Sequence, residues 1–397
     1  MQVGIEKLHG YIPPYYVDLV DLAQERGVDP NKFTKGLMQE KMAFTPQEQD
    51  IIVMALKAAE PLLTLEDKVV IDQVIVATES AFDYSKAAST YIHHLLGIQP
   101  FARAYEIKEA CYGGTAALQQ ACDYIRSHPG RKVLVITSDI SKYGLKTSGE
   151  VTQGAGAIAM LVSNQPHILA IESETVFYSQ HEYDFWRPEN QDYALVDGKF
   201  SNELYMSVFE KVVLEFHRRY PHVLKDLRFM HFHLPYSKMG LKALKHLQTI
   251  LKSSDMSVNF QPAFDQWLEE YDVTTRLNRQ VGNIYTGSLF LSLLSTLTQT
   301  DLDLSQQKIG LFSYGSGAVG ELFIGTVGPH YRDHLLFSDL DQQFQRREKL
   351  TIEEYEAMYD QPVKADGEGN WQADHAPVEL GWHLSSIQNH QRTYQKD

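Results

Sequence analysis

Residues 104–122 read AYEIKEACYGGTAALQQAC, a stretch that joins the pattern of a strand, a tight turn and a helix. Residues 104–110 predict a short strand that runs directly into Cys111. Gly113 and Gly114 permit a tight turn behind it. The apolar residues that follow recur at helical spacing, and they are Ala117, Leu118, Ala121, Cys122 and Ile125. Cys111 is therefore predicted to lie where a strand gives way to a helix.

Strand patterns recur on both sides of this turn, with helical patterns between them. Residues 72–80 and 131–139 are apolar runs that end in polar residues, which predicts two buried strands. Residues 154–163 and 167–173 predict two more, joined by a turn with the sequence Asn-Gln-Pro. Alternating strands and helices are typical of the α/β class, so we expect layered α/β architecture.

The second half of the chain repeats this order faintly. Residues 227–233 predict a strand, residues 238–250 an amphipathic helix, and residues 308–326 a strand, a glycine turn and a strand. CYGGTAALQQA also resembles GNIYTGSLFLSLL, which begins at Gly282, in pattern more than in identity. Duplication and chance similarity both explain this match. A duplication would place the Cys111 turn against the loop that contains Asn283.

Composition limits the classes of function. The 397 residues are 43% hydrophobic and carry a formal net charge of −15, which argues against binding to nucleic acid. An anionic ligand would need a local basic patch. The sequence contains no apolar run of 18 residues and no signal-peptide pattern, so we expect no association with membranes. The only cysteines are Cys111 and Cys122, which indicates a reducing cytoplasm and no disulfide framework.

Cys111 is the first candidate for chemistry. A thiol at a helix N-terminus feels the positive end of the helix dipole, which favours the thiolate and so a nucleophile. The alternative is a buried structural cysteine, the role that we expect for Cys122. Local sequence does not decide between the two interpretations.

Glu79 and His233 are the next candidates, and each has an ordinary alternative. Glu79 closes the apolar strand at 72–80, where partial loss of water would raise its basicity, but a solvated strand-end carboxylate gives the same pattern. His233 ends the strand at 227–233, and alternation places His231 on the same face. A metal site with both is conceivable, but no third ligand stands at a helpful spacing. We therefore favour a single functional imidazole at His233 and no metal.

Lys238 and Lys242 lie four residues apart, on one face of the helix predicted at 238–250. In such an acidic chain they suit a ligand that carries phosphate, although a solvated helix face explains them equally well. The glycine loops YGG, GAGA and GSG do not match nucleotide-binding patterns. Their backbone N–H groups can hold a developing oxyanion on a small acyl group instead.

Together these segments resemble the hydroxymethylglutaryl-CoA (HMG-CoA) synthase family in its bacterial form, over nearly the whole chain. The matching segments are ATES around Glu79, EACYGGTAAL around Cys111, QGAGAIAML after Thr152, YDFWRP at 183–188, VDG followed by Ser201, HLPYSK from His233, GNIYTGS and FSYGSGA. A Cys-Tyr-Gly turn alone is moderately specific. Eight segments in the right order are highly specific. The loop with Lys146, Thr147 and Val151 departs mildly from the family pattern.

The resemblance implies a thiolase-like fold of two pseudo-symmetric halves in five layers, αβαβα, with halves at 1–166 and 167–397 and usually a homodimer. It makes Cys111 the acyl-enzyme nucleophile, Glu79 the general base and acid, and His233 the partner of the acetoacetyl group. The positions expected to contact acyl-CoA are Asp29, Thr152, Ser201, Lys238, Lys242, Asn283 and Ser313.

The implied reaction condenses acetyl-CoA with acetoacetyl-CoA and water to HMG-CoA, a step of the mevalonate pathway to isoprenoids. It needs no metal and no cofactor, because CoA belongs to the substrates. Three other interpretations stay open: a thiolase or ketoacyl synthase, an enzyme that takes substrates tethered to acyl-carrier proteins, and a non-catalytic scaffold. The segment around Glu79 speaks against the first of these.

Overall fold

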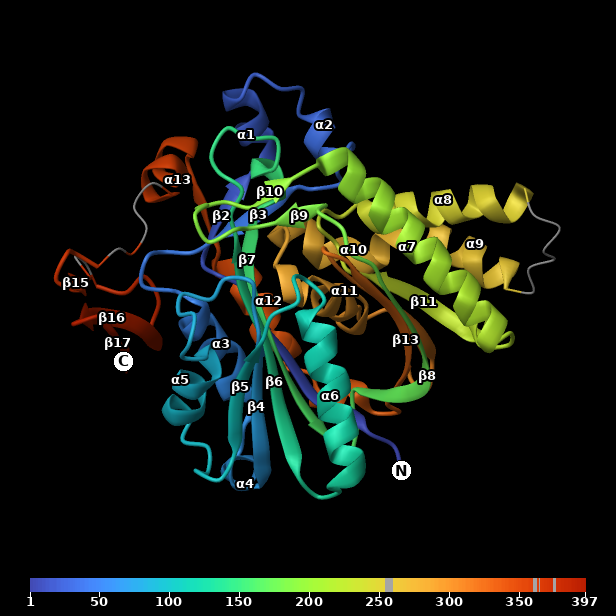
Figure 1. The fold of residues 1–397 in the computed structure, drawn as a ribbon, viewed down its shortest axis with the longest axis horizontal. Helices are drawn as coiled ribbons and strands as arrows, with labels where there is room; N and C mark the ends of the chain where they lie inside the picture. Colours follow the sequence, from blue (N-terminus) through green and yellow to red (C-terminus); the bar gives the residue numbers. More distant parts are fainter. Residues whose placement is uncertain (254–259, 360–362, 364, 374–375) are drawn as a thin grey trace.

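A nine-stranded mixed sheet runs through the molecule in the order β11-β12-β13-β8-β1-β7-β6-β4-β5 (Figure 1). The computed structural model describes all residues except 254–259, 360–362, 364 and 374–375. The strands of this sheet are β1 (Gly4–Tyr11), β4 (Ile71–Ala77), β5 (Arg103–Ile107), β6 (Lys132–Ser141), β7 (Gly154–Ser163), β8 (Leu169–Ser179), β11 (Leu227–Phe232), β12 (Lys308–Gly315) and β13 (Val319–Val327). The strands predicted from the sequence are confirmed, with shifts of a few residues at some ends.

The two parts of the sheet repeat one pattern of strand directions. In the first part β4 runs parallel to β6, while β6–β7 and β7–β1 are antiparallel. In the second part β11 runs parallel to β12, while β12–β13 and β13–β8 are antiparallel. The parts meet where Gly4 and Ile5 of β1 pair with Ala170 and Leu169 of β8. This correspondence supports the duplication over chance similarity.

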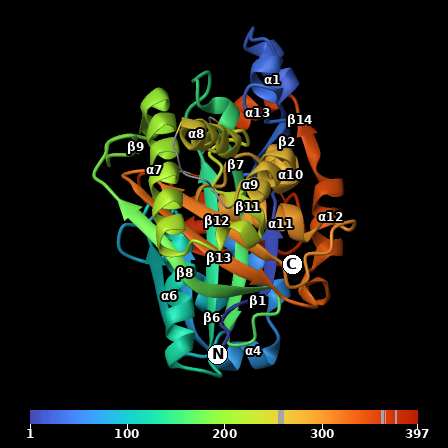
Figure 2. The ribbon, with the colours of Figure 1, turned by 90° about the vertical axis from the view of Figure 1, so that its right-hand side faces the viewer.

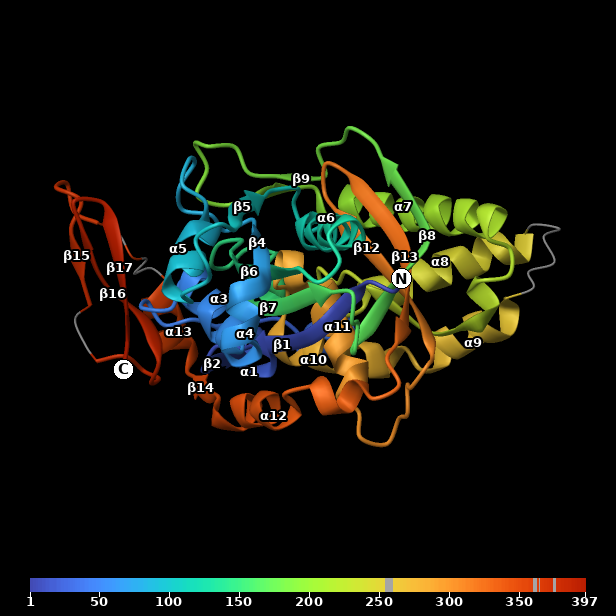
Figure 3. The same ribbon diagram turned by 90° about the horizontal axis from the view of Figure 1, so that it is seen from below.

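The buried apolar side chains hold five layers together, which confirms the expected αβαβα arrangement. Two clusters each join one part of the sheet to an outer helical layer, and one surrounds the central helices. The first cluster joins α3 (Ile51–Ala59) and α5 (Ala88–Leu95) to the first part of the sheet. The second surrounds α6 (Gly113–Ser127) and α11 (Ser288–Leu297), which lie between the two parts. The third joins the second part to a final helical layer, visible on the right of Figure 1 and again in Figures 2 and 3. Its helices are α7 (Gly198–Arg219), α8 (Met239–Ser253) and α9 (Gln261–Glu269).

The central helices have sequences that suit their surroundings. All ten residues of α11 are buried, and Ser292 and Ser295 donate their hydroxyls to the backbone carbonyls of Thr274 and Leu291. In α6 the predicted apolar face is buried, including Cys122, which confirms the structural role expected for that cysteine. A Cβ on Gly114 would lie 2.5 Å from Thr286 O, so only glycine lets α6 approach the loop that follows Asn283. The Cys111 turn therefore packs against the Asn283 loop, as the duplication predicts.

The remaining elements surround this body. A small sheet is formed by β2 (Tyr15–Asp18), β3 (Lys41–Phe44) and β14 (Glu348–Leu350). The other elements are α1 (Leu19–Glu25), α2 (Asn31–Thr34), α4 (Leu65–Val70), β9 (Phe185–Trp186), β10 (Leu195–Val196), α10 (Tyr271–Val281), α12 (Phe337–Arg346), α13 (Ile352–Tyr359), β15 (Trp371–Gln372), β16 (Trp382–Gln388) and β17 (Gln391–Lys396). Trp371 and Trp382 pack against the cluster around α3 and anchor the C-terminal strands there. Within the described residues, no helix combines the length and apolarity that crossing a bilayer requires.

Candidate active site

Cys111 lies between the end of β5 and the start of α6, at the turn predicted from the sequence. Its neighbour Ala110 has φ +42°, a conformation that non-glycine residues rarely adopt. From the second half, the turn after β12 approaches closely: a Cβ on Gly315 would lie 2.8 Å from Tyr112 N. The thiol is partly accessible and lines a cavity, so it is not sealed in the core.

Glu79 meets Cys111 because β4 and β5 are parallel neighbours. Ala77 pairs with Ile107, so both chains leave the sheet at the same edge. The Cys111 thiol donates a hydrogen bond to Glu79 Oε1 with an Sγ–Oε1 distance of 2.9 Å. A thiol and a possible base, 32 residues apart in the sequence, are thus in direct contact.

The surroundings raise the pKa values of both Glu79 and Cys111. Burial raises the pKa of Glu79 to about 8, and the negative charge of Asp139 adds to the rise. Burial, followed by the Glu79 charge, raises the pKa of the Cys111 thiol well above its ordinary value. The structure therefore adds two effects that oppose the thiolate favoured by the helix dipole at Cys111, namely loss of water and a nearby carboxylate. Glu79 is the neighbouring group that can accept the thiol proton.

Asp139 accepts a hydrogen bond from the backbone of Glu79, and the sequence did not predict a role for it. It lies near the end of β6, has no exposed surface, and accepts hydrogen bonds from Glu79 N (2.7 Å), Thr78 Oγ1 (2.9 Å) and Ser80 Oγ (2.9 Å). Thr286 of the Asn283 loop donates to it through both N and Oγ1. Burial raises the pKa of Asp139 to about 6, although its donors oppose the rise. The signal for it was the single carboxylate at the end of the buried run 131–139.

His233 approaches from the second half, immediately after β11. Its N–H donates to Phe312 O at 2.8 Å and its carbonyl accepts from Tyr205 OH at 2.7 Å. Its Nδ1 is buried and has no hydrogen-bond partner within the described part of the chain. Burial lowers the pKa of His233 to about 3, so the ring is neutral and can donate one hydrogen bond to a ligand.

His231 takes no part in the same site. Its Nδ1 lies 3.1 Å from Ser292 Oγ and its Nε2 3.3 Å from Thr296 Oγ1, both on α11. Burial lowers the pKa of His231 to about 3 as well. Among the described residues, three or more His, Cys, Asp or Glu side chains are nowhere grouped to hold a metal ion.

Cys111 and His233 face one cavity of about 310 Å³. Four of the predicted acyl-CoA contacts also line it, namely Thr152, Ser201, Lys242 and Asn283. Asn283 is held by Tyr143, whose hydroxyl accepts from Asn283 Nδ2 at 3.1 Å. Lys242 Nζ donates to Tyr236 OH at 2.9 Å, and burial lowers the pKa of Lys242. The cavity thus combines a thiol, a neutral imidazole and one half-buried cation.

The other three predicted contacts lie outside the lining of this cavity. Lys238 donates to Lys35 O at 2.7 Å on the surface. Asp29 accepts from Asn31 N at 2.9 Å in an exposed turn. Ser313 is buried and accepts from Thr115 Oγ1 of α6 at 2.8 Å, so its hydroxyl faces the central layer. Their contacts with a ligand stay predictions.

Asp184 is a further buried carboxylate that the sequence did not single out. It accepts from Tyr314 OH at 2.8 Å and from Gly317 N at 2.9 Å, and Ser201 Oγ lies 3.3 Å away. Asp184 therefore ties the glycine turn after β12 to the start of α7. The sequence signal was its place in the segment YDFWRP, which predicted membership of a family but not a contact.

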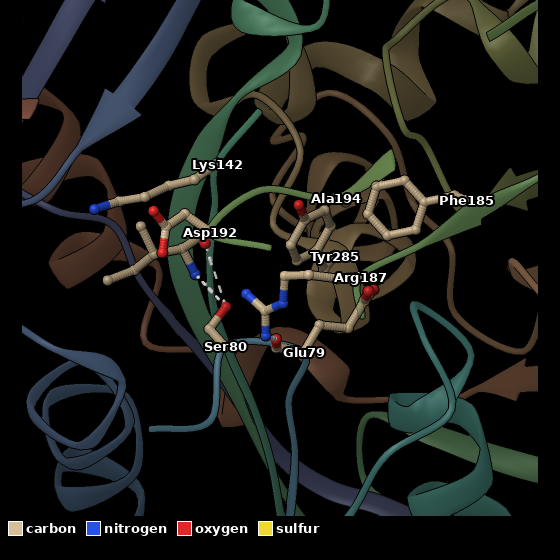
Figure 4. Close-up of a pocket in the computed structure, with 9 residues that line it drawn as sticks. Glu79, Ser80, Lys142, Phe185, Arg187, Asp192, Ala194 and Tyr285 are labelled. Atoms are coloured by element: carbon tan, nitrogen blue, oxygen red, sulfur yellow. Dashed lines mark hydrogen bonds between the residues drawn. The ribbon is translucent and has the colours of Figure 1, made fainter. Parts of the chain in front are cut away.

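A second cavity of about 220 Å³ lies beside Glu79 (Figure 4). Its lining consists of Glu79, Ser80, Ile140, Lys142, Phe185, Arg187, Asp192, Ala194 and Tyr285. Arg187 Nη2 donates to Glu79 O at 2.9 Å. Phe185 and Tyr285 line both cavities. Glu79 is thus bonded to a residue of the first cavity and forms part of the wall of the second.

A cysteine at a helix N-terminus, in contact with a carboxylate and set in a five-layer α/β fold, defines a thiol enzyme of the thiolase-like class. Comparison with known proteins narrows this class. The family described as hydroxymethylglutaryl-coenzyme A synthase matches in its N-terminal part over residues 1–166 and in its C-terminal part over residues 170–275 and 250–397. The chain therefore belongs to the hydroxymethylglutaryl-CoA synthase family.

Individual relatives agree with this assignment. The hydroxymethylglutaryl-CoA synthase of Enterococcus faecalis is 46% identical over 394 residues, which are 99% of this chain and 100% of the relative. A 3-hydroxy-3-methylglutaryl-ACP synthase of polyketide biosynthesis from Bacillus subtilis is 32% identical over 90% of this chain and 88% of its own length. A crystal structure of HMG-CoA synthase complexed with CoA superimposes with a TM-score of 0.93 at 40% identity and covers both chains fully.

Proposed function

We propose that this protein condenses acetyl-CoA with acetoacetyl-CoA and water to HMG-CoA, in the mevalonate pathway, through an acetyl group on Cys111. The observation that carries the proposal is the 2.9 Å contact between Cys111 Sγ and Glu79 Oε1 beside a cavity that His233 also lines. Family membership and the likeness to a CoA-bound synthase support the choice of substrates.

The first step transfers the acetyl group to the thiol. Glu79 accepts the Cys111 proton, the sulfur attacks the thioester carbon of acetyl-CoA, and CoA leaves as the thiol with that proton, so that Glu79 is ionised again. Because the thiol is protonated at rest, this transfer depends on an ionised Glu79. Covalent attachment divides one difficult condensation into two easier stages.

The second step forms the carbon–carbon bond. Glu79 removes a proton from the acetyl methyl group, and backbone N–H groups of Cys111 and of the glycine turn after Phe312 stabilise the enolate. The carbanion attacks the ketone carbon of acetoacetyl-CoA. The neutral ring of His233 donates a hydrogen bond to the new alkoxide, a role that its lowered pKa favours over delivery of a full proton. The proton that Glu79 took from the methyl group passes to this alkoxide, so the product carries a hydroxyl and Glu79 is ionised again. Water then cleaves the Cys111 thioester.

CoA binding and assembly are parts of the same proposal. Lys242, which lines the cavity, and Lys238, which lies outside its lining, would meet the anionic parts of CoA. Asp29 and Ser313 would be further contacts. No metal and no redox cofactor takes part. We also propose a homodimer in the cytoplasm. The edge position of β5, together with the nearly fully exposed Phe101 and Tyr84, supports pairing of two chains.

Intact-protein mass spectrometry after mixing with acetyl-CoA tests the proposal. The expected result is a mass increase of one acetyl group, its absence in Cys111→Ala, and formation of HMG-CoA when free acetoacetyl-CoA is added. A Cys111→Ala protein that still gains an acetyl group would contradict the assignment. Acetylation from a carrier protein but not from free acetyl-CoA would favour the carrier-linked reaction of the Bacillus subtilis relative.

A further inference from the structure

The cavity beside Glu79 has the size and chemistry of a water compartment. Its volume of about 220 Å³ far exceeds the roughly 10–15 Å³ that one water requires. Arg187 and Asp192 place charged side chains in its lining (Figure 4). Asp192 is exposed and Ala194 half-buried, so the cavity reaches the surface through the loop at 187–194. A chain of waters can therefore extend from solvent to Glu79.

An aromatic wall separates this compartment from the cavity that holds Cys111 and His233. The rings of Phe185 and Tyr285 line both spaces, and their centroids are 6.1 Å apart. Tyr143 packs edge-on against both, with centroid distances of 6.0 Å to each. The two spaces thus share the rings of Phe185 and Tyr285, and Glu79 in the lining of one is hydrogen-bonded to Cys111 in the lining of the other.

The last step of the proposed reaction needs such a separate entrance. After condensation the six-carbon acyl unit is attached to Cys111 at one end and to CoA at the other. The CoA arm then occupies the cavity of about 310 Å³ through which the substrates arrived. Water must nevertheless reach the thioester carbon at Cys111. This argument depends on the proposed function, because it requires the covalent intermediate.

We propose that the cavity lined by Ser80, Lys142, Arg187, Asp192 and Ala194 admits the water that hydrolyses the Cys111 thioester, while CoA fills the substrate cavity. The water oxygen bonds to the thioester carbon as Glu79 takes one of its protons. The carbon–sulfur bond breaks, and Glu79 returns that proton to the departing Cys111 sulfur. The released acid gives its remaining proton to solvent, so HMG-CoA leaves as the carboxylate and the thiol is restored.

Ala194→Phe tests the route by filling it from its wall. The matched control is Leu195→Phe, which adds an aromatic ring at the next residue, an exposed position of β10 that lines neither cavity. Quenched-flow mass spectrometry of the full-length protein follows acetylation by acetyl-CoA. After acetoacetyl-CoA is added, it also follows the adduct of enzyme and HMG-CoA. We expect Ala194→Phe to acetylate within about twofold of the wild-type rate but to hydrolyse the adduct about tenfold more slowly, so that the adduct accumulates. Leu195→Phe should match the wild type in both steps.

The outcomes separate this proposal from the proposed function. A wild-type protein that never becomes acetylated would refute the function itself. Normal acetylation, with adduct hydrolysis in Ala194→Phe as fast as in Leu195→Phe, would refute the water route and leave the function standing. Asp192→Phe fills the same cavity from its exposed rim, and it provides the test if thermal unfolding shows that Ala194→Phe does not fold. Equal slowing of both chemical steps in the folded variant would also refute the route, because a blocked water path delays hydrolysis alone.

Discussion

The raised pKa of Glu79 predicts that the rate of Cys111 acetylation depends steeply on pH. The thiol can lose its proton to Glu79 only when that carboxylate is ionised. With a pKa of about 8, roughly a tenth of the molecules carry an ionised Glu79 at pH 7 and roughly nine tenths at pH 9. The pKa is raised, so activity is present above it and is lost as the pH falls through it. We expect acetylation to rise about tenfold from pH 7 to pH 9.

Single-turnover acetylation, quenched in acid and measured by mass spectrometry between pH 6 and 9.5, checks this expectation. Asp139→Asn is the informative second variant, because it removes a charge that helps to raise the pKa of Glu79. Its profile should move toward lower pH. A wild-type rate that is flat between pH 6.5 and 8.5, or that falls as the pH rises, would refute the role of Glu79 as acceptor of the thiol proton. An unshifted profile in a folded Asp139→Asn protein would mean that burial alone sets the pKa.

Four further substitutions have expected outcomes. Glu79→Gln should abolish condensation. It should also raise the free energy of unfolding by about 1–3 kcal/mol at pH 9, measured by urea denaturation, because the folded state then buries no charge at this position. A variant less stable than the wild type would contradict this. His233→Ala should slow condensation about a hundredfold while acetylation stays within about threefold, since the lost hydrogen bond forms only to the alkoxide; equal loss in both half-reactions would remove His233 from that role. Lys242→Ala should raise the KM for acetoacetyl-CoA about tenfold. Lys238 lies outside the cavity lining and donates to Lys35 O, so Lys238→Ala should raise it about threefold or less in the same steady-state assay, and the reverse order would contradict the placement of the two cations.

Local sequence predicted the parts of the fold that local chemistry determines. Residues 154–163 are apolar or small throughout and form β7 over the same residues, because a strand covered on both faces needs a run without charged side chains. The turn at Cys111 was predicted because two glycines follow it and a helical apolar face follows them. β1 was missed: its sequence, GIEKLHGY, mixes charged and apolar residues, yet it lies between β7 and β8. There Lys132 bonds the carboxylate of Glu6 at 2.6 Å, a partner 126 residues away.

Some residues of the candidate site could likewise be predicted from the sequence, and others could not. Cys111, Glu79 and His233 each stand at the end of a predicted element, but their ordinary alternatives stayed open until the resemblance to the family implied a role for each. Asp139 and Asp184 could not be singled out, since their roles consist of hydrogen bonds to residues far along the chain, such as Thr286 and Gly317. The protonation of Cys111 was likewise beyond the sequence. It depends on how completely the folded protein removes water from a thiol and a carboxylate together.

The burial of Glu79 and Cys111 favours the abstraction of a proton from carbon but hinders the final hydrolysis. A carboxylate held at a pKa near the working pH is a better base toward carbon than a solvated one, and the buried Asp139 beneath Glu79 raises its basicity further. The acetylated cysteine must also be protected from premature hydrolysis. Yet the cycle ends with hydrolysis, so water must be excluded during one step and admitted during the next. A wall of three aromatic rings, with Glu79 at its edge, meets both needs if water approaches from a side that the substrate never occupies.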